Sequence, residues 1–135
     1  MIVVDSSAVV AMILGEPTAK KLAERLAADR PRIMSVASYV EVGAVLAGRT
    51  REDRMAAVDE LDEFLAEVGI ELAPVDEAQA HVALRARVRH GRGMGHGGAL
   101  NFGDAFAYAL AKVNDAPLLF VGDDFGTTDV TPALS

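Results

Sequence analysis

The sequence contains no cysteine among its 135 residues. This absence excludes a disulfide framework, a zinc site with Cys ligands and a thiol nucleophile. No apolar run reaches membrane-spanning length, and the start, MIVVD, lacks the basic region of a secretory signal. We therefore expect a cytoplasmic protein without membrane contact. No repeat and no linker rich in Pro or Ser divides the chain, so we expect a single domain over residues 1–135.

Acidic residues are absent between Glu77 and Asp104, although the whole chain carries a formal net charge of −7. The acidic balance argues against nucleic-acid binding by bulk charge. The acid-free interval nevertheless holds all three His and four of the 13 Lys and Arg residues, namely Arg85, Arg87, Arg89 and Arg92. This basic strip is either a solvated helix face with a flexible loop or a track for a polyanion beside an acidic site.

Short strand patterns alternate with helical patterns along the whole chain. Strands are predicted over residues 1–5, 32–35, 70–75 and 117–121. Helices are predicted over residues 6–14, 17–28, 36–48, 50–69, 76–90 and 100–111, with Pro17 in a first turn, Thr50 as a cap and Gly69 as a stop. This alternation predicts an α/β fold in which helices cover a mostly parallel sheet of four to five strands.

Several carboxylates stand where predicted strands and helices meet. Asp104 heads the apolar stretch LNFGDAFAYALA, where it could cap the helix, although Asn101 could also do so. Asp5 directly follows the first strand and could cap the next helix, for which Ser6 and Ser7 are also candidates. The adjacent acids Asp123 and Asp124 follow the last strand and could be turn residues.

Glu41 is a further acid in a helix that is otherwise almost free of charge. Ser38 and Glu41 match the spacing of a capping box, which is a structural explanation. If the helix begins at Ser35, however, Glu41 falls in its second turn, too far from the end for such a box. It is then a carboxylate on a mostly apolar helix and needs a partner.

Asp5, Glu41, Asp104 and one of Asp123 or Asp124 are predicted to meet at one rim of the sheet, because ligands of parallel α/β sheets bind at the carboxyl ends of the strands. Four carboxylates gathered there would repel one another strongly. A hard divalent cation such as Mg²⁺ or Mn²⁺ relieves that repulsion, since both prefer oxygen ligands. Such ions activate water and stabilise the oxygens of an in-line phosphoryl displacement.

Four blocks of the sequence resemble the PIN-domain ribonucleases of the VapC type, the toxins of bacterial toxin–antitoxin pairs. They are IVVDSSAVVAMILGEP, SVASYVEVGAVL, ALNFGDAFAYALAK and PLLFVGDDFGTTDV, in this order. The resemblance covers essentially the full length. It implies a PIN-like three-layer sandwich and an endoribonuclease that depends on Mg²⁺ or Mn²⁺.

The resemblance also implies roles for individual residues. Asp5, Glu41 and Asp104 match the first three family acids, and Asp5 and Asp104 are expected to hold the main ion. Asp123 is favoured as the fourth acid because it lies nearer the strand end, with Asp124 as the alternative. Ser7 matches a position that holds a water molecule.

Partners follow from the same resemblance. It implies an RNA substrate, a cognate antitoxin and a homodimer. A basic antitoxin residue would fit the acidic pocket and block metal or substrate. We expect the phosphate contacts to come from the basic strip, at Arg85, Arg89 and Arg92.

Other classes of protein fit the sequence less well. A phosphatase of the haloacid-dehalogenase type would need a second Asp where Ser7 stands, and a response-regulator receiver would need an acidic pair after the first strand. A metal-dependent adhesion motif begins with Asp5 and Ser7 but is broken at Val9. The strongest alternative outside enzymes is a PIN-fold binding protein without catalytic activity, which the retained set of carboxylates disfavours.

Overall fold

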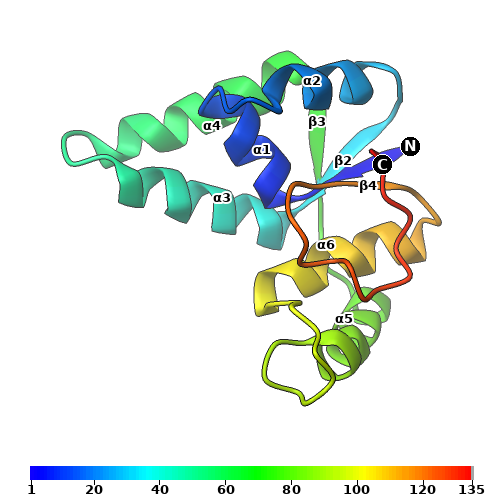
Figure 1. The fold of residues 1–135 in the computed structure, drawn as a ribbon. Helices are drawn as coiled ribbons and strands as arrows, with labels where there is room; N and C mark the ends of the chain where they lie inside the picture. The colour runs from blue at the N-terminus through cyan, green and yellow to red at the C-terminus, as the bar shows by residue number, and fades with distance from the viewer. Residues whose placement is uncertain (135) are drawn as a thin grey trace.

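The sheet of the computed structural model, which describes residues 1–134, is parallel throughout. Within this range its strands are β1 (Ile2–Val4), β2 (Arg32–Ser35), β3 (Ile70–Ala73) and β4 (Leu118–Leu119), in the spatial order β3-β2-β1-β4. Figure 1 shows helices on both faces of this sheet. The predicted α/β fold with a parallel sheet is therefore confirmed.

Alternate side chains of the strands enter two separate hydrophobic clusters, which creates the three layers. Ile2 and Val4 pack with α1 (Ser6–Ile13), α2 (Ala19–Ala27), α3 (Val36–Arg49) and α4 (Arg54–Val68). Val3 packs on the opposite face with α5 (Glu77–His90) and α6 (Phe102–Val113). Strands buried on both faces explain the continuous apolar runs of the sequence. Among residues 1–134, no helix is long and apolar enough to span a bilayer.

Some predicted boundaries are wrong by a few residues. Thr50 does not cap α4, because it is the extended residue that ends α3, and Asp53 caps α4 by accepting a hydrogen bond from the Ala56 N–H. The helix predicted from residue 17 starts at Ala19, and β4 is shorter than the predicted strand over residues 117–121. The stop at Gly69 is confirmed, since its φ of 73° is left-handed.

The order of the strands places the ends of β2, β1 and β4 next to one another at the expected rim of the sheet. β1 lies between β2 and β4, so the loops that follow these three strands leave the sheet side by side. The Asp5 N–H donates to the Leu119 carbonyl at 2.9 Å, which ties the end of β1 to the end of β4. On the other side, α3 starts directly at Ser35, whose side chain caps it. The sheet therefore sets the relative positions of α1, α3 and the segment after β4.

Arg32 holds the opposite end of the molecule through its guanidinium group. This buried side chain donates to the carbonyls of Leu26, Ala27 and Asp29 at the end of α2 and to that of Val68 at the end of α4. A cation suits the negative end of a helix dipole. Within the described part of the chain, Arg32 has no carboxylate partner, so these carbonyls alone compensate its charge.

Replacing Arg32 with Met is expected to destabilise the fold by roughly 2–4 kcal/mol, because the carbonyls at two helix ends lose their donor. Arg32→Lys should be intermediate, since an ammonium keeps the charge but not the planar set of donors. Urea unfolding measures both effects. Arg51→Met, on the exposed segment between α3 and α4, is the control and should change little. Wild-type stability of Arg32→Met would contradict this role.

Candidate active site

Asp5 is the most deeply buried acid of the site, with 1% of its surface exposed. It follows β1 and caps α1: its Oδ2 accepts hydrogen bonds from the Ser7 N–H at 3.0 Å and the Ser7 hydroxyl at 2.6 Å. Its other oxygen, Oδ1, has no hydrogen-bond partner within residues 1–134. Desolvation by this burial raises the pKa of Asp5 from 3.8 to about 6, against the lowering effect of the Ser7 bonds.

Asp104 lies in the first turn of α6 and is also buried. It forms a capping box with Asn101: each residue's backbone N–H donates to the other's side chain, at 2.8 and 3.0 Å. Asn101 is therefore the N-cap, and the carboxylate of Asp104 supports the box from inside the helix. Desolvation raises the pKa of Asp104 to about 7 against the lowering effect of the Asn101 N–H, and the negative charges of Asp5 and Asp124 raise it further.

Glu41 lies in the second turn of α3, as expected if the helix starts after Ser35. Its partner is Ser6, whose hydroxyl donates to the Glu41 carboxylate, so the capping box with Ser38 does not form. Glu41 also packs against Gly103 in the first turn of α6. A Cβ atom at Gly103 would overlap the Glu41 carboxylate, so a larger residue there would displace this side chain from its position.

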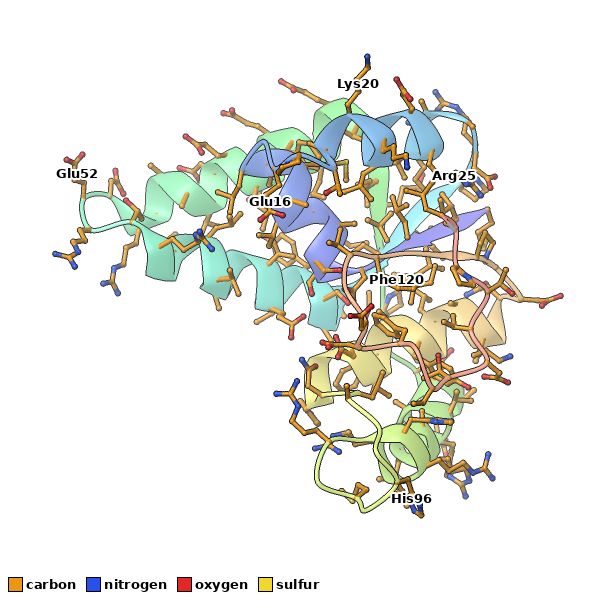
Figure 2. The ribbon with its side chains drawn as sticks, in the orientation of Figure 1. Glu16, Lys20, Arg25, Glu52, His96 and Phe120 are labelled. Carbon is orange, nitrogen blue, oxygen red and sulfur yellow. The ribbon has the colours of Figure 1, made fainter. Side chains whose placement is uncertain are left out.

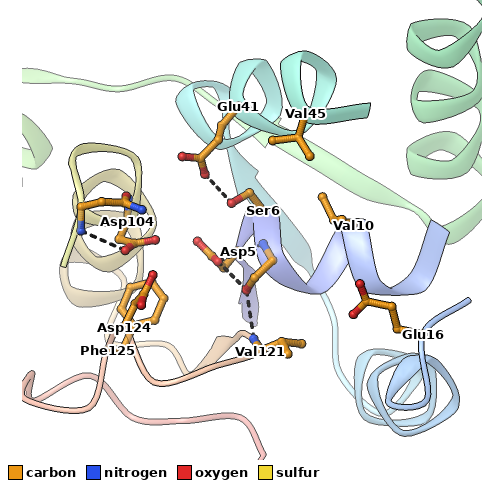
Figure 3. A pocket seen from close by; sticks show the side chains of 12 residues that line it. Asp5, Ser6, Val10, Glu16, Glu41, Val45, Asp104, Val121, Asp124 and Phe125 are labelled. Atoms are coloured by element: carbon orange, nitrogen blue, oxygen red, sulfur yellow. Dashed lines mark hydrogen bonds between the residues drawn. The ribbon is translucent and has the colours of Figure 1, made fainter. Parts of the chain in front are cut away.

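The four acids face one pocket of about 340 Å³. Figure 3 shows Asp5, Glu41, Asp104 and Asp124 pointing toward one another from the end of β1, from α3, from α6 and from the segment after β4. Asn101, Val121 and Phe125 complete the wall beside them. Buried carboxylates that repel one another and keep an unpaired oxygen form a donor set suited to a hard cation.

The acids of the pocket stand farther apart than the ligands of a metal site formed by side chains alone. Across residues 1–134, no three His, Asp or Glu side chains stand close enough together to hold one metal ion between them. Mg²⁺, however, is commonly held by only one or two carboxylates and keeps several of its own waters. The pair Asp5 and Asp104 is therefore a sufficient donor set, and the unpaired Asp5 Oδ1 is the observation that fits a cation best.

A family model described as "PIN domain" matches residues 2–130. The chain belongs to the PIN-domain family. It is 45% identical over 131 residues to Ribonuclease VapC42 of Mycobacterium tuberculosis, covering 97% of this chain and 98% of the relative. Ribonuclease VapC of Mycolicibacterium smegmatis is 44% identical over 128 residues, which cover 95% of this chain and 96% of the relative. The resemblance to VapC-type PIN domains is thus confirmed.

A solved structure shares the fold at much lower sequence identity. VapBC2 from Rickettsia felis, solved bound to a DNA fragment from its promoter, superimposes with a TM-score of 0.75 at 16% identity. The match covers 98% of this chain and 96% of that one. At this identity the likeness shows a common PIN fold.

Within this PIN domain, the structure distinguishes the two adjacent acids of the last block. Asp124 lines the pocket, and its charge raises the pKa of Asp104. Asp123 is exposed and is not among the residues that line the pocket. Gly122 causes this difference, because its φ of 98° is left-handed and turns the segment after β4. Phe125 then anchors the segment in the core. The geometry therefore favours Asp124, the alternative, over Asp123.

Ser7 forms a bridge inside the PIN fold. Its hydroxyl donates to Asp5 and accepts from the Val121 N–H at 2.9 Å, which links α1 to the segment after β4. This engagement leaves the hydroxyl one acceptor site. The role of Ser7 in holding a water molecule stays a prediction.

Glu16 lines the same pocket, a position that the sequence patterns did not single out. It follows the end of α1, and Figure 3 shows it across Val10 from the other acids. The only signal for Glu16 in the sequence is that it lies within IVVDSSAVVAMILGEP, the first of the four blocks that resemble the VapC-type PIN domains. It extends the negative charge of the pocket toward the surface.

The basic strip lies beside α6 in this PIN domain. Arg85 and Arg89 are exposed and one turn apart on α5, and Arg92 is exposed at the start of the loop between α5 and α6. The Arg92 N–H donates to the Leu100 carbonyl, which closes the base of that loop directly before Asn101. His96 lies farther along the loop, at the end of the molecule opposite α2 (Figure 2).

Asp5→Asn should stabilise the metal-free protein at pH 7.5, because it removes a buried charge and keeps an oxygen for the Ser7 hydrogen bonds. The raised pKa means that the stability from neutral Asp5 is complete below pH 3.8 and lost as the pH rises through about 6. The gain should therefore be on the order of 2–3 kcal/mol at pH 7.5 and shrink toward pH 4.5. Urea unfolding in EDTA at several pH values measures it.

The matched control for this prediction is Asp76→Asn at the N-cap of α5, where the side chain is exposed. This variant should show no comparable gain at pH 7.5. A gain for Asp5→Asn that is absent, or that is the same at every pH, would contradict the burial of a charged Asp5.

Proposed function

We propose that this chain is an endoribonuclease dependent on Mg²⁺ or Mn²⁺ and the toxin of a toxin–antitoxin pair. Its site comprises Asp5, Glu41, Asp104 and Asp124. The observation that carries the proposal is the convergence of these four acids on one pocket, with an unpaired buried oxygen on Asp5. The relatives named as VapC ribonucleases, at 44–45% identity over nearly the full chain, support the choice of RNA as substrate.

The acidic pocket requires a cation before a phosphodiester can approach it, because phosphate and carboxylates repel one another. Asp5 and Asp104 would hold the ion. When bound, such an ion polarises the phosphate oxygens and makes water a better nucleophile. Glu41 and Asp124 complete the negative wall, and either carboxylate can accept the proton that an attacking water must lose. The water oxygen then forms a new P–O bond while one P–O bond of the RNA backbone breaks, and the leaving sugar oxygen takes up a proton from solvent.

The RNA strand would pass over the basic strip before it reaches the pocket. Arg85, Arg89 and Arg92 are exposed, and none of them has an ion-pair partner in the described part of the chain. Free guanidinium groups suit phosphate contacts. These residues supply the local positive charge that the acidic chain as a whole lacks.

The proposed inhibitor is a cognate antitoxin that places a basic side chain in the pocket. A toxin–antitoxin complex from Klebsiella pneumoniae is among the solved structures that share the fold. In this chain the acids, including Glu16 at the outer edge, offer charge complementarity to an Arg or Lys.

Asp5→Asn and Asp104→Asn should each lower cleavage of total cellular RNA by more than about 100-fold in the presence of Mn²⁺. Asp124→Asn should lower it about 10- to 100-fold, whereas Asp123→Asn, one residue away but exposed, should retain activity. Discrete fragments that EDTA abolishes provide the measurement. Equal cleavage by wild type and variants would indicate a contaminant and contradict the site. If the wild type binds metal but cleaves no RNA in a way that depends on the site acids, the result would favour the inactive PIN-fold binding protein.

We also propose that the chain forms a homodimer through an apolar face of α3, α5 and α6. Phe102 and Phe106 pack edge to face and line two adjoining grooves, one beside Val40 of α3 and one beside Leu84 of α5. Phe102 is 72% exposed, Val40 66% and Leu84 62%. A continuous exposed apolar patch is typical of an interface.

Leu84→Glu should convert this dimer to a monomer, because a charge would be buried at the interface. Sedimentation equilibrium measures the mass directly. Met55→Glu is the control, since Met55 is 66% exposed on α4, outside this face, and its variant should remain dimeric. A monomeric wild type, or a dimeric Leu84→Glu variant, would contradict the assignment.

A further inference from the structure

One face of α6 carries three polar residues at helical spacing, Asp104, Tyr108 and Lys112. Residues four apart in a helix lie on the same side, one above the other. The segment after β4 runs along this row. At its start, Asp124 and Asp104 line the same pocket. Five residues later, Asp129 accepts hydrogen bonds from the Tyr108 hydroxyl at 2.5 Å and from Lys112 Nζ at 3.1 Å.

The two ends of this segment differ in what they contribute. At one end, Asp124 and Asp104 face the same pocket, and the repulsion between their negative charges opposes the approach of the segment unless a proton or a cation lies between them. The contacts of Asp129 are attractive, and Tyr108 is a buried side chain. The hydrogen bonds from Tyr108 and Lys112 lower the pKa of Asp129, because both donors favour its ionised form.

Phe125 fixes the middle of the segment but does not by itself determine where the Asp124 side chain points. Its ring is buried and lies 4.8 Å from that of Phe120, whose place at the end of β4 is seen in Figure 2. On one side, Gly122 turns the chain with a left-handed φ. On the other side, a turn in which the Gly126 N–H donates to the Asp123 carbonyl leads to Asp129, whose side chain ties this stretch to α6.

We propose that Tyr108 and Asp129, assisted by Lys112, form a clamp that positions Asp124 in the metal site. None of the three faces the pocket, so they are positioning residues that act through Asp124. The inference rests on the proposed function, because it assigns Asp124 to that site. Partners that orient a metal ligand typically affect metal affinity by 10- to 100-fold.

The test is a double-mutant cycle that uses Mn²⁺ alone as the probe. Isothermal titration calorimetry would measure Mn²⁺ affinity for wild type, Tyr108→Phe, Asp124→Asn and the double variant. Tyr108→Phe keeps the buried ring and removes only the hydroxyl. It should weaken Mn²⁺ binding about tenfold in the wild-type background and have no further effect in the Asp124→Asn background. Asp129→Asn should reproduce the effect of Tyr108→Phe.

Tyr39→Phe is the matched control, since Tyr39 donates a similar hydrogen bond to Asp62, between α3 and α4. It should leave Mn²⁺ affinity unchanged. If Tyr108→Phe binds Mn²⁺ like wild type, or weakens binding equally in both backgrounds, the clamp is overturned while the metal site stands. If the wild type binds no Mn²⁺, the proposed metal site fails and the clamp fails with it.

Discussion

The buried carboxylate of Asp5 is the constraint on which the rest of this structure depends. It stands at the end of the central β1, shielded from water, with one oxygen held by Ser7 and the other unpaired within residues 1–134. Desolvation raises its pKa to about 6 and that of Asp104 to about 7. Burying two acids in this way costs folding free energy near neutral pH. Under the proposed function, a bound cation offsets this cost.

The remaining features of the fold keep these acids together despite their repulsion. Parallel strands bring β1, β2 and β4 to the same rim, and Ser7 links α1 to the segment after β4. The hydroxyl of Ser6 holds Glu41, and Gly103 lets α6 approach that carboxylate closely. Hydrogen bonds to Asp5 and Glu41, together with the sheet that positions their elements, therefore keep these acids at one pocket.

The sequence patterns predicted the order of strands and helices, the shared rim and the places of Asp5, Glu41 and Asp104, because these follow from periodicity and from strand ends. They did not predict which acid of the last block enters the pocket. Asp123 is nearer the strand, but after the left-handed turn at Gly122 it is Asp124, and not Asp123, that lines the pocket. Contacts such as Tyr108 with Asp129 join residues 21 apart in the chain, and no local pattern signals them.

Anomalous X-ray scattering from crystals equilibrated with Mn²⁺ tests the central claim most directly. The account predicts one strong anomalous peak in the pocket, bound by Asp5 and Asp104 and adjacent to Asp124, that disappears in crystals of Asp5→Asn. A peak that lies elsewhere and persists in Asp5→Asn, or a pocket without a peak at Mn²⁺ concentrations that support RNA cleavage, would contradict it.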